Sequence, residues 1–189
     1  MIHPQIWNRL HNKPHAVERY SVLMAALADL GAREEPAGSN HGPQIEHLVR
    51  GIGDYWWSGL TNPDYCAAAV SQWIRRGLGL PDWDRRRRQP FAPEVDGHPF
   101  GRWLVGCGQF ADWAREHGAT LEAPTPGAVW IIGYRKDGRQ VWQHTGFVLD
   151  YEPGATSFRT IEGNWNGGVI SREMPVSQPV MFFRWWTDV

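Results

Sequence analysis

The stretch Asn62-Pro63-Asp64-Tyr65-Cys66-Ala67-Ala68-Ala69-Val70 places a cysteine where a helix is expected to begin. Pro63 suits the first helical position, because its missing N–H would have no intrahelical partner there. Asn62 before it is a favourable N-cap residue. Apolar side chains then recur at helical spacing from the cysteine, at Val70, Trp73 and Ile74. The pattern predicts a buried helix that ends at Gly77.

Cys66 falls in the first turn of this predicted helix. A thiol in that position lies at the positive end of the helix dipole, which favours the thiolate form. This is the environment of a nucleophilic cysteine. The alternative is a small buried side chain on an alanine-rich helix, since free cysteine is among the most buried residue types. A catalytic interpretation therefore requires a partner histidine elsewhere in the chain.

Length and composition limit the class of protein. With 189 residues, 42% of them hydrophobic, the chain is long enough for one globular domain with an ample core, and we predict a single domain over residues 1–189. A net charge of −1 gives no basis for a nucleic-acid partner attracted by bulk charge. The two cysteines cannot form a disulfide framework. One bridge between Cys66 and Cys107 is the alternative, and it would consume the thiol. We interpret Cys107 as structural or incidental.

The N-terminus lacks a basic segment followed by an apolar core, so we predict no signal peptide and synthesis in the cytoplasm. No apolar run approaches the roughly 18 residues that a membrane-spanning helix needs. We therefore predict no integral membrane segment.

The first half of the chain has helical periodicity. Residues 1–13 are predicted to form an irregular N-terminal arm. Apolar residues at helical spacing predict further helices over 14–30, 44–50 and 109–117. Residues 78–105 contain several prolines and Arg85-Arg86-Arg87-Arg88, and we expect an irregular basic insertion there. The arginine run is either a solvated loop or a patch for an anionic polymer or membrane surface.

From Pro126 the periodicity changes from helical to alternating. Strands are predicted over 127–134, 140–151, 157–164, 169–172 and 180–186. Lys136-Asp137-Gly138-Arg139 joins the first two as a hairpin turn of the Asp-Gly type. Helices first and antiparallel strands later predict an α+β fold, with N-terminal helices packed on a C-terminal antiparallel sheet.

The predicted sheet supplies the missing partners for Cys66. His144 lies in the middle of one strand, although an isolated histidine there is often a satisfied core residue. On the next strand, alternation places Glu162 and Asn164 on one face. A carboxylate or amide beside His144 would orient the imidazole and leave its other nitrogen for the thiol. Thiol, imidazole and polar orienting group are the three parts of cysteine nucleophilic catalysis.

Four segments carry a family resemblance, and they occur in the family's order. They are Tyr65-Cys66-Ala67-Ala68, Pro126-Gly127-Ala128-Val129, His144-Thr145-Gly146-Phe147-Val148 and Ile161-Glu162-Gly163-Asn164. From about residue 20 onward, the chain resembles CHAP-type members of the NlpC/P60 superfamily, which are papain-like cell-wall amidases and peptidases.

The resemblance implies a papain-like fold and a set of roles. Cys66 would be the nucleophile, His144 the general base and then acid, and either Glu162 or Asn164 the orienting residue. We expect the aromatic side chains near these motifs to contact substrate, namely Tyr65, Trp142 and Trp165. Neither a metal nor a cofactor is expected, because two cysteines with scattered histidines give no zinc spacing and no Asp-rich calcium loop is visible.

The function implied is hydrolysis of an amide bond of peptidoglycan, as an N-acetylmuramoyl-L-alanine amidase or an endopeptidase. A phage endolysin, a tail lysin or an antibacterial amidase effector would act on the cell wall, in the periplasm, after release or delivery. Partners beyond peptidoglycan would then be a holin, a virion or an immunity protein. Two alternatives remain open: a non-enzymatic phage structural or glycan-binding module, and a papain-like protein deamidase or acyltransferase.

Overall fold

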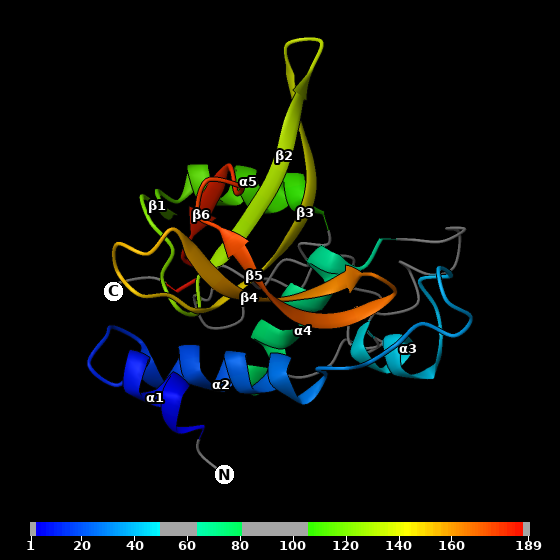
Figure 1. Cartoon of the computed structure of the whole chain (residues 1–189), viewed down its shortest axis with the longest axis horizontal. Helices are drawn as coiled ribbons and strands as arrows, with labels where there is room; N and C mark the ends of the chain where they lie inside the picture. Colours follow the sequence, from blue (N-terminus) through cyan, green and yellow to red (C-terminus); the bar gives the residue numbers. More distant parts are fainter. Residues whose placement is uncertain (1–2, 50–63, 81–105, 187–189) are drawn as a thin grey trace.

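The computed structural model describes residues 3–49, 64–80 and 106–186. In these ranges the chain forms five helices and one curled antiparallel sheet of six strands (Figure 1). The predicted α+β class is therefore confirmed. The sheet order is β1-β6-β2-β3-β4-β5, and every neighbouring pair is antiparallel.

The helices agree with the predicted ones except at the N-terminus. They are α1 Pro4–Leu10, α2 Ala16–Ala28, α3 Pro43–Val49, α4 Cys66–Gly77 and α5 Cys107–Glu116. The prediction of an irregular arm over residues 1–13 is wrong, because α1 occupies most of it. Ile6 and Leu10, one turn apart, are buried, and Trp7 packs edge-on against Tyr20 of α2 at 5.4 Å between ring centroids. This contact with a distant segment stabilises a helix too short to stand alone.

The predicted strands are confirmed to within a few residues, and one short strand is new. The strands are β1 Thr120–Leu121, β2 Val129–Lys136, β3 Arg139–Asp150, β4 Ser157–Trp165, β5 Gly168–Pro175 and β6 Met181–Phe183. β1 has only two residues and pairs with β6, so no local periodicity could reveal it. Asp137 and Gly138 have positive φ angles of 51° and 76°, as the predicted hairpin turn requires.

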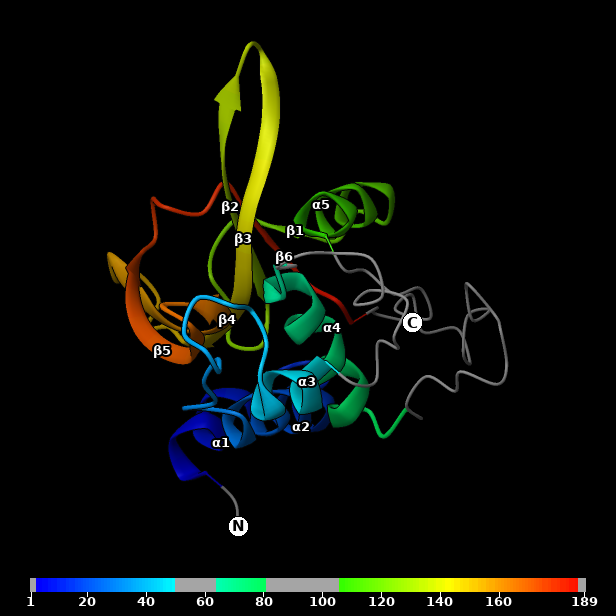
Figure 2. The same ribbon diagram turned by 90° about the vertical axis from the view of Figure 1, so that its right-hand side faces the viewer.

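Helix α4 lies at the centre of the molecule. It contacts α2 and α3 on one side and strands β3 and β4 on the other, so it is enclosed between helices and sheet (Figure 2). Every residue from Cys66 to Arg75 is buried, including the polar ones. The predicted apolar face is confirmed, since Val70, Trp73 and Ile74 are fully buried. Burial on the polar side is a property of the tertiary packing that helical spacing alone does not predict.

The start of α4 differs from the prediction. The helix begins at Cys66 with Tyr65 as its N-cap residue, so the assignment of Asn62 as N-cap is wrong. Small side chains let β4 approach closely here: a Cβ added to Gly163 would lie only 3.0 Å from the Cβ of Ala69. This close packing sets the distance between the Cys66 end of the helix and the sheet.

The basic insertion beyond residue 80, with Arg85–Arg88, falls outside the described residues. Because α4 begins at Cys66, the placement of Pro63 at its first position is wrong, as is that of Asn62 before it. Among the residues that are described, no helix combines the length and the apolar character needed to cross a bilayer.

Candidate active site

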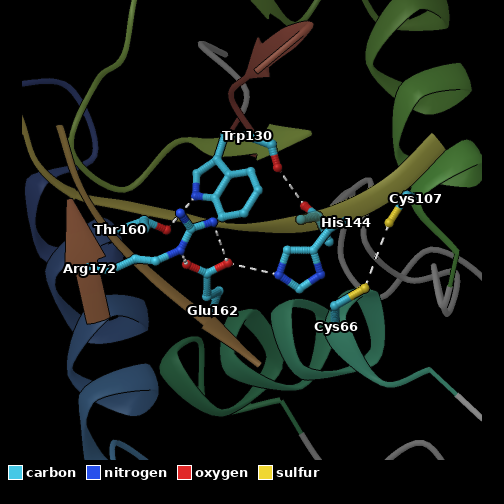
Figure 3. A network of polar contacts seen from close by, with 8 residues as sticks. Cys66, Cys107, Trp130, His144, Thr160, Glu162 and Arg172 are labelled. Atoms are coloured by element: carbon cyan, nitrogen blue, oxygen red, sulfur yellow. Dashed lines mark hydrogen bonds and ion pairs between the residues drawn. The ribbon is translucent and has the colours of Figure 1, made fainter. Parts of the chain in front are cut away.

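Cys66 and Cys107 face each other at the starts of two helices. Cys66 is the first residue of α4 and Cys107 the first residue of α5. Their sulfur atoms lie 3.8 Å apart, and both are free thiols (Figure 3). Cys66 is 4% exposed and Cys107 is 8% exposed. The interpretation of Cys107 as merely structural is thus too narrow, because the fold brings it into contact with the predicted nucleophile.

His144 comes from the middle of β3 and lies beside the two cysteines. Its ring is buried, and Nε2 donates a hydrogen bond to Oε2 of Glu162 over 2.8 Å. The other ring nitrogen lies on the Cys66 side (Figure 3), and interaction with Cys66 is among the causes that raise the pKa of His144. The structure therefore brings together Cys66, His144 and Glu162, in the order in which a thiol, a base and an orienting carboxylate act.

Glu162 is fully buried and has a second partner, Arg172 of β5. The Arg172 Nε donates to Oε1 of Glu162 over 2.7 Å, and Nη2 lies 3.4 Å from Oε2. The guanidinium also lies over the Trp165 ring, 4.2 Å from its centroid. Arg172 is not among the site residues predicted from the sequence. Its signal was an opposite charge on the neighbouring predicted strand, but only the β4–β5 register, which pairs Thr160 with Arg172, makes that charge a diagonal neighbour of Glu162.

Two tryptophans flank the His144 ring. The centroid of Trp165 lies 5.3 Å and that of Trp130 lies 5.6 Å from the imidazole centroid. Trp130 is itself fixed, because its indole Nε1 donates to Thr160 Oγ1 over 2.6 Å. These contacts hold the imidazole in one plane and exclude water from most of its surface. Trp165, predicted to contact substrate, is half-buried and borders the histidine.

Asn164 does not orient His144. An irregularity in the β4–β5 pairing after Glu162 ends the regular alternation, and Asn164 has a left-handed backbone with φ of 61°. The expectation that Glu162 and Asn164 share one face is therefore wrong. The Asn164 Nδ2 instead donates to Oδ1 of Asp64 over 2.9 Å, which ties the end of β4 to the residues just before α4.

Tyr65 is fully buried, so the structure does not place its side chain where a ligand would contact it. Its hydroxyl donates to Oε1 of the buried Glu34 over 3.3 Å. Burial, and after it the charge of Glu34, raise the pKa of the Tyr65 phenol. The phenol stays protonated, and its hydrogen bond to Glu34 fixes the residue that precedes α4.

Trp142, the third predicted substrate contact, is half-buried and packs against α5. The Arg115 guanidinium lies 5.0 Å from the centroid of its ring. Trp142 thus secures the helix that carries Cys107.

The electrostatics of the cluster favour an ion pair. The hydrogen bond from Cys107 lowers the pKa of the Cys66 thiol most, burial opposes it, and the hydrogen bond and charge of His144 lower that pKa further. Burial alone would lower the pKa of His144, but its hydrogen bonds and charge interactions with Cys66 and Glu162 outweigh burial and raise the pKa to about 9. The shared hydrogen bond raises the pKa of Cys107. These directions favour a Cys66 thiolate beside a His144 imidazolium, with Cys107 as the protonated thiol.

Within residues 3–49, 64–80 and 106–186, no three His, Cys, Asp or Glu side chains converge as metal ligands would. The arrangement can generate a charged sulfur nucleophile with an adjacent proton donor.

Comparison of the chain with protein-family models, with curated proteins and with solved structures found no match.

Proposed function

We propose that this chain is a cysteine-dependent peptidoglycan hydrolase of CHAP type, with a papain-like fold, that cleaves an amide bond of the cell-wall peptide. The observation that supports the chemistry is the arrangement in Figure 3, where His144 lies between Cys66 and Glu162 and bonds the Glu162 carboxylate over 2.8 Å. A thiolate with a lowered pKa beside an imidazolium is the activated state that cysteine amidases use.

The proposed reaction has two stages. The Cys66 thiolate attacks the amide carbonyl and forms a C–S bond, and the oxyanion is held by the backbone N–H of Cys66 at the α4 N-terminus. His144 gives its proton to the amine nitrogen as the C–N bond breaks. It then takes a proton from water, whose oxygen attacks the thioester. The C–S bond breaks, the acid product leaves, and the thiolate–imidazolium pair is restored.

The substrate is proposed from the order of the four sequence motifs together with the surroundings of the site. Peptidoglycan offers both sugar rings and peptide amides, and half-buried tryptophans such as Trp165 and Trp142 supply flat surfaces for sugar contacts. The enzyme would act on the cell wall, in the periplasm, after release or delivery, as an endolysin, a tail lysin or an antibacterial effector.

The test is digestion of purified sacculi, followed by mass spectrometry of the soluble fragments. The native chain should release fragments whose masses identify the bond cut, and Cys66→Ala should reduce release by about 10³-fold or more, because the catalytic pair acts as a unit. Gln143→Ala is the matched control, since Gln143 neighbours His144 on β3 but is exposed, and it should digest sacculi normally. Absence of fragments from the native chain would refute a peptidoglycan substrate.

A further inference from the structure

No step of the hydrolytic mechanism proposed above transfers a proton or a group to Cys107, although its hydrogen bond lowers the pKa of Cys66. The two sulfurs lie 3.8 Å apart at the first positions of α4 and α5, although the residues are far apart in the sequence. Figure 3 shows the two sulfur atoms pointing toward one another. Each thiol therefore has one close sulfur partner.

The packing of α5 on β3 keeps Cys107 at this position. Gly108 permits the approach, because a Cβ added there would lie 3.3 Å from Cδ1 of Trp142. Farther along the helix, Arg115 lies over the same indole ring. The side chain of Trp142 thus contacts both ends of α5 and fixes the start of the helix beside Cys66.

We infer that Cys66 and Cys107 form a redox modification site, in which a small hydroperoxide oxidises Cys66 and Cys107 then closes a reversible disulfide within the chain. The inference goes beyond the proposed function: formation of the bond depends only on the two sulfurs. Its consequence for hydrolysis rests on the proposed function, because the disulfide would remove the nucleophile.

The chemistry balances with one molecule of hydrogen peroxide. The Cys66 thiolate attacks one peroxide oxygen, the O–O bond breaks, and the proton that had left the Cys66 thiol joins the departing hydroxide, which gives water and a Cys66 sulfenic acid. The Cys107 sulfur then attacks the Cys66 sulfur, the S–O bond breaks, and the Cys107 proton leaves with the hydroxide as a second water. Two thiols and one peroxide give one disulfide and two waters. An added dithiol reverses the change by exchange.

The geometry favours closure of this bond over further oxidation of Cys66. The sulfurs must approach from 3.8 Å to about 2.0 Å to form the bond. Cys66 is only 4% exposed and Cys107 only 8% exposed, so the proposed oxidation requires an oxidant as small as hydrogen peroxide. The sulfenic acid would form with its resolving thiol already in contact.

The experiment treats the reduced full chain with hydrogen peroxide, blocks the remaining thiols with an alkylating agent and maps the peptides by mass spectrometry. We expect the two free thiols to fall to none in monomeric protein, with a peptide pair joined through Cys66 and Cys107, and to return to two after dithiothreitol. In Cys107→Ser, and in Cys107→Ala as a second variant, Cys66 should instead be trapped by dimedone as the sulfenic acid and pass to forms that dithiothreitol cannot restore.

Two results would overturn the inference. One is a native chain in which Cys66 is overoxidised as readily as in the Cys107 variants. The other is a disulfide that joins two molecules, seen as a dimer on a non-reducing gel. The thiol state is read by mass without any substrate. If the reduced chain does not digest sacculi but still forms the disulfide with peroxide, the proposed function is refuted and this inference stands.

Discussion

Nε2 of His144 lies 2.8 Å from Oε2 of Glu162. This contact joins two pairs of side chains, each made of two opposite charges, into one network. Cys66 and His144 form the first pair, and Glu162 and Arg172 form the second. The charges alternate along the network as thiolate, imidazolium, carboxylate and guanidinium. An even number of alternating charges lets each buried group face an opposite charge, which offsets the cost of burial.

Glu162→Gln should lower the pKa of His144. The variant removes the negative charge that stabilises the imidazolium and leaves Arg172 as an uncompensated positive neighbour. The pKa of His144, about 9 in the native chain, should fall by about one to two pH units, since a charge-assisted hydrogen bond contributes about 1.5–3 kcal/mol. His144 would then lose its proton at a lower pH. The fall in hydrolysis rate at high pH should shift to lower pH by the same amount. NMR titration of the His144 ring measures the shift directly.

Asn164→Ala provides the comparison for this prediction, because Asn164 bonds Asp64 rather than His144. Its His144 titration should match that of the native chain. A shift in Asn164→Ala with none in Glu162→Gln would contradict the assignment of Glu162 as the orienting residue.

Cys107→Ala should raise the pKa of Cys66. The hydrogen bond from Cys107 is the largest influence lowering that pKa, so its loss should move the midpoint of Cys66 alkylation by iodoacetamide upward. The expected shift is about one pH unit. This corresponds to the lower end of the free energies of hydrogen bonds to charged groups, because S–H is a weak donor. Cys107→Ser is the matched variant, since its hydroxyl can still donate, and it should shift less than the alanine. Equal midpoints in the native and alanine chains would exclude this role for Cys107.

Arg172→Met should destabilise the fold. Glu162 is fully buried and Arg172 is 23% exposed, so the substitution leaves a buried carboxylate without its guanidinium. We expect a loss of about 3 kcal/mol in the free energy of unfolding, the lower end for breaking a buried pair, measured by urea denaturation. Arg159→Met is the control, because Arg159 lies on neighbouring β4 but is exposed, and its effect should stay within about 0.5 kcal/mol.

Much of the fold is predictable from periodicity because its elements have strong local signals. The run after Cys66 has helical spacing, and the segment from Val129 to Asp150 alternates around an Asp-Gly turn, so α4, β2 and β3 follow from the sequence. The elements that local sequence does not define are α1 and β1. α1 is stabilised by packing on α2 and β1 by pairing with β6, and such long-range contacts have no periodic signature.

Prediction of the site succeeded for residues whose role follows from their chemical type. It failed for residues whose position depends on strand register. A helix-start cysteine, a strand histidine and two polar residues on the next strand led to Cys66, His144 and either Glu162 or Asn164, and the structure places Glu162 against the histidine. Asn164 was misplaced because the pairing irregularity after Glu162 breaks the period of two. The role of Cys107 was missed because only the packing of α5 on β3 brings it to Cys66.

Gly163→Ala tests whether the close packing of β4 on α4 sets the geometry of the site. The new methyl group would lie 3.0 Å from the Cβ of Ala69 and 3.3 Å from the Tyr65 ring, so the helix and strand must separate. We expect a loss of about 1–3 kcal/mol in unfolding free energy, as for other overpacked cores, and slower alkylation of Cys66 at neutral pH as its contact with His144 lengthens. Gly106→Ala is the control, since its nearest new contact would be an ordinary 3.5 Å to Gln109. Native stability and reactivity in Gly163→Ala would show that the α4–β4 spacing does not control the thiolate, and the activation of Cys66 would then depend on its side-chain partners alone.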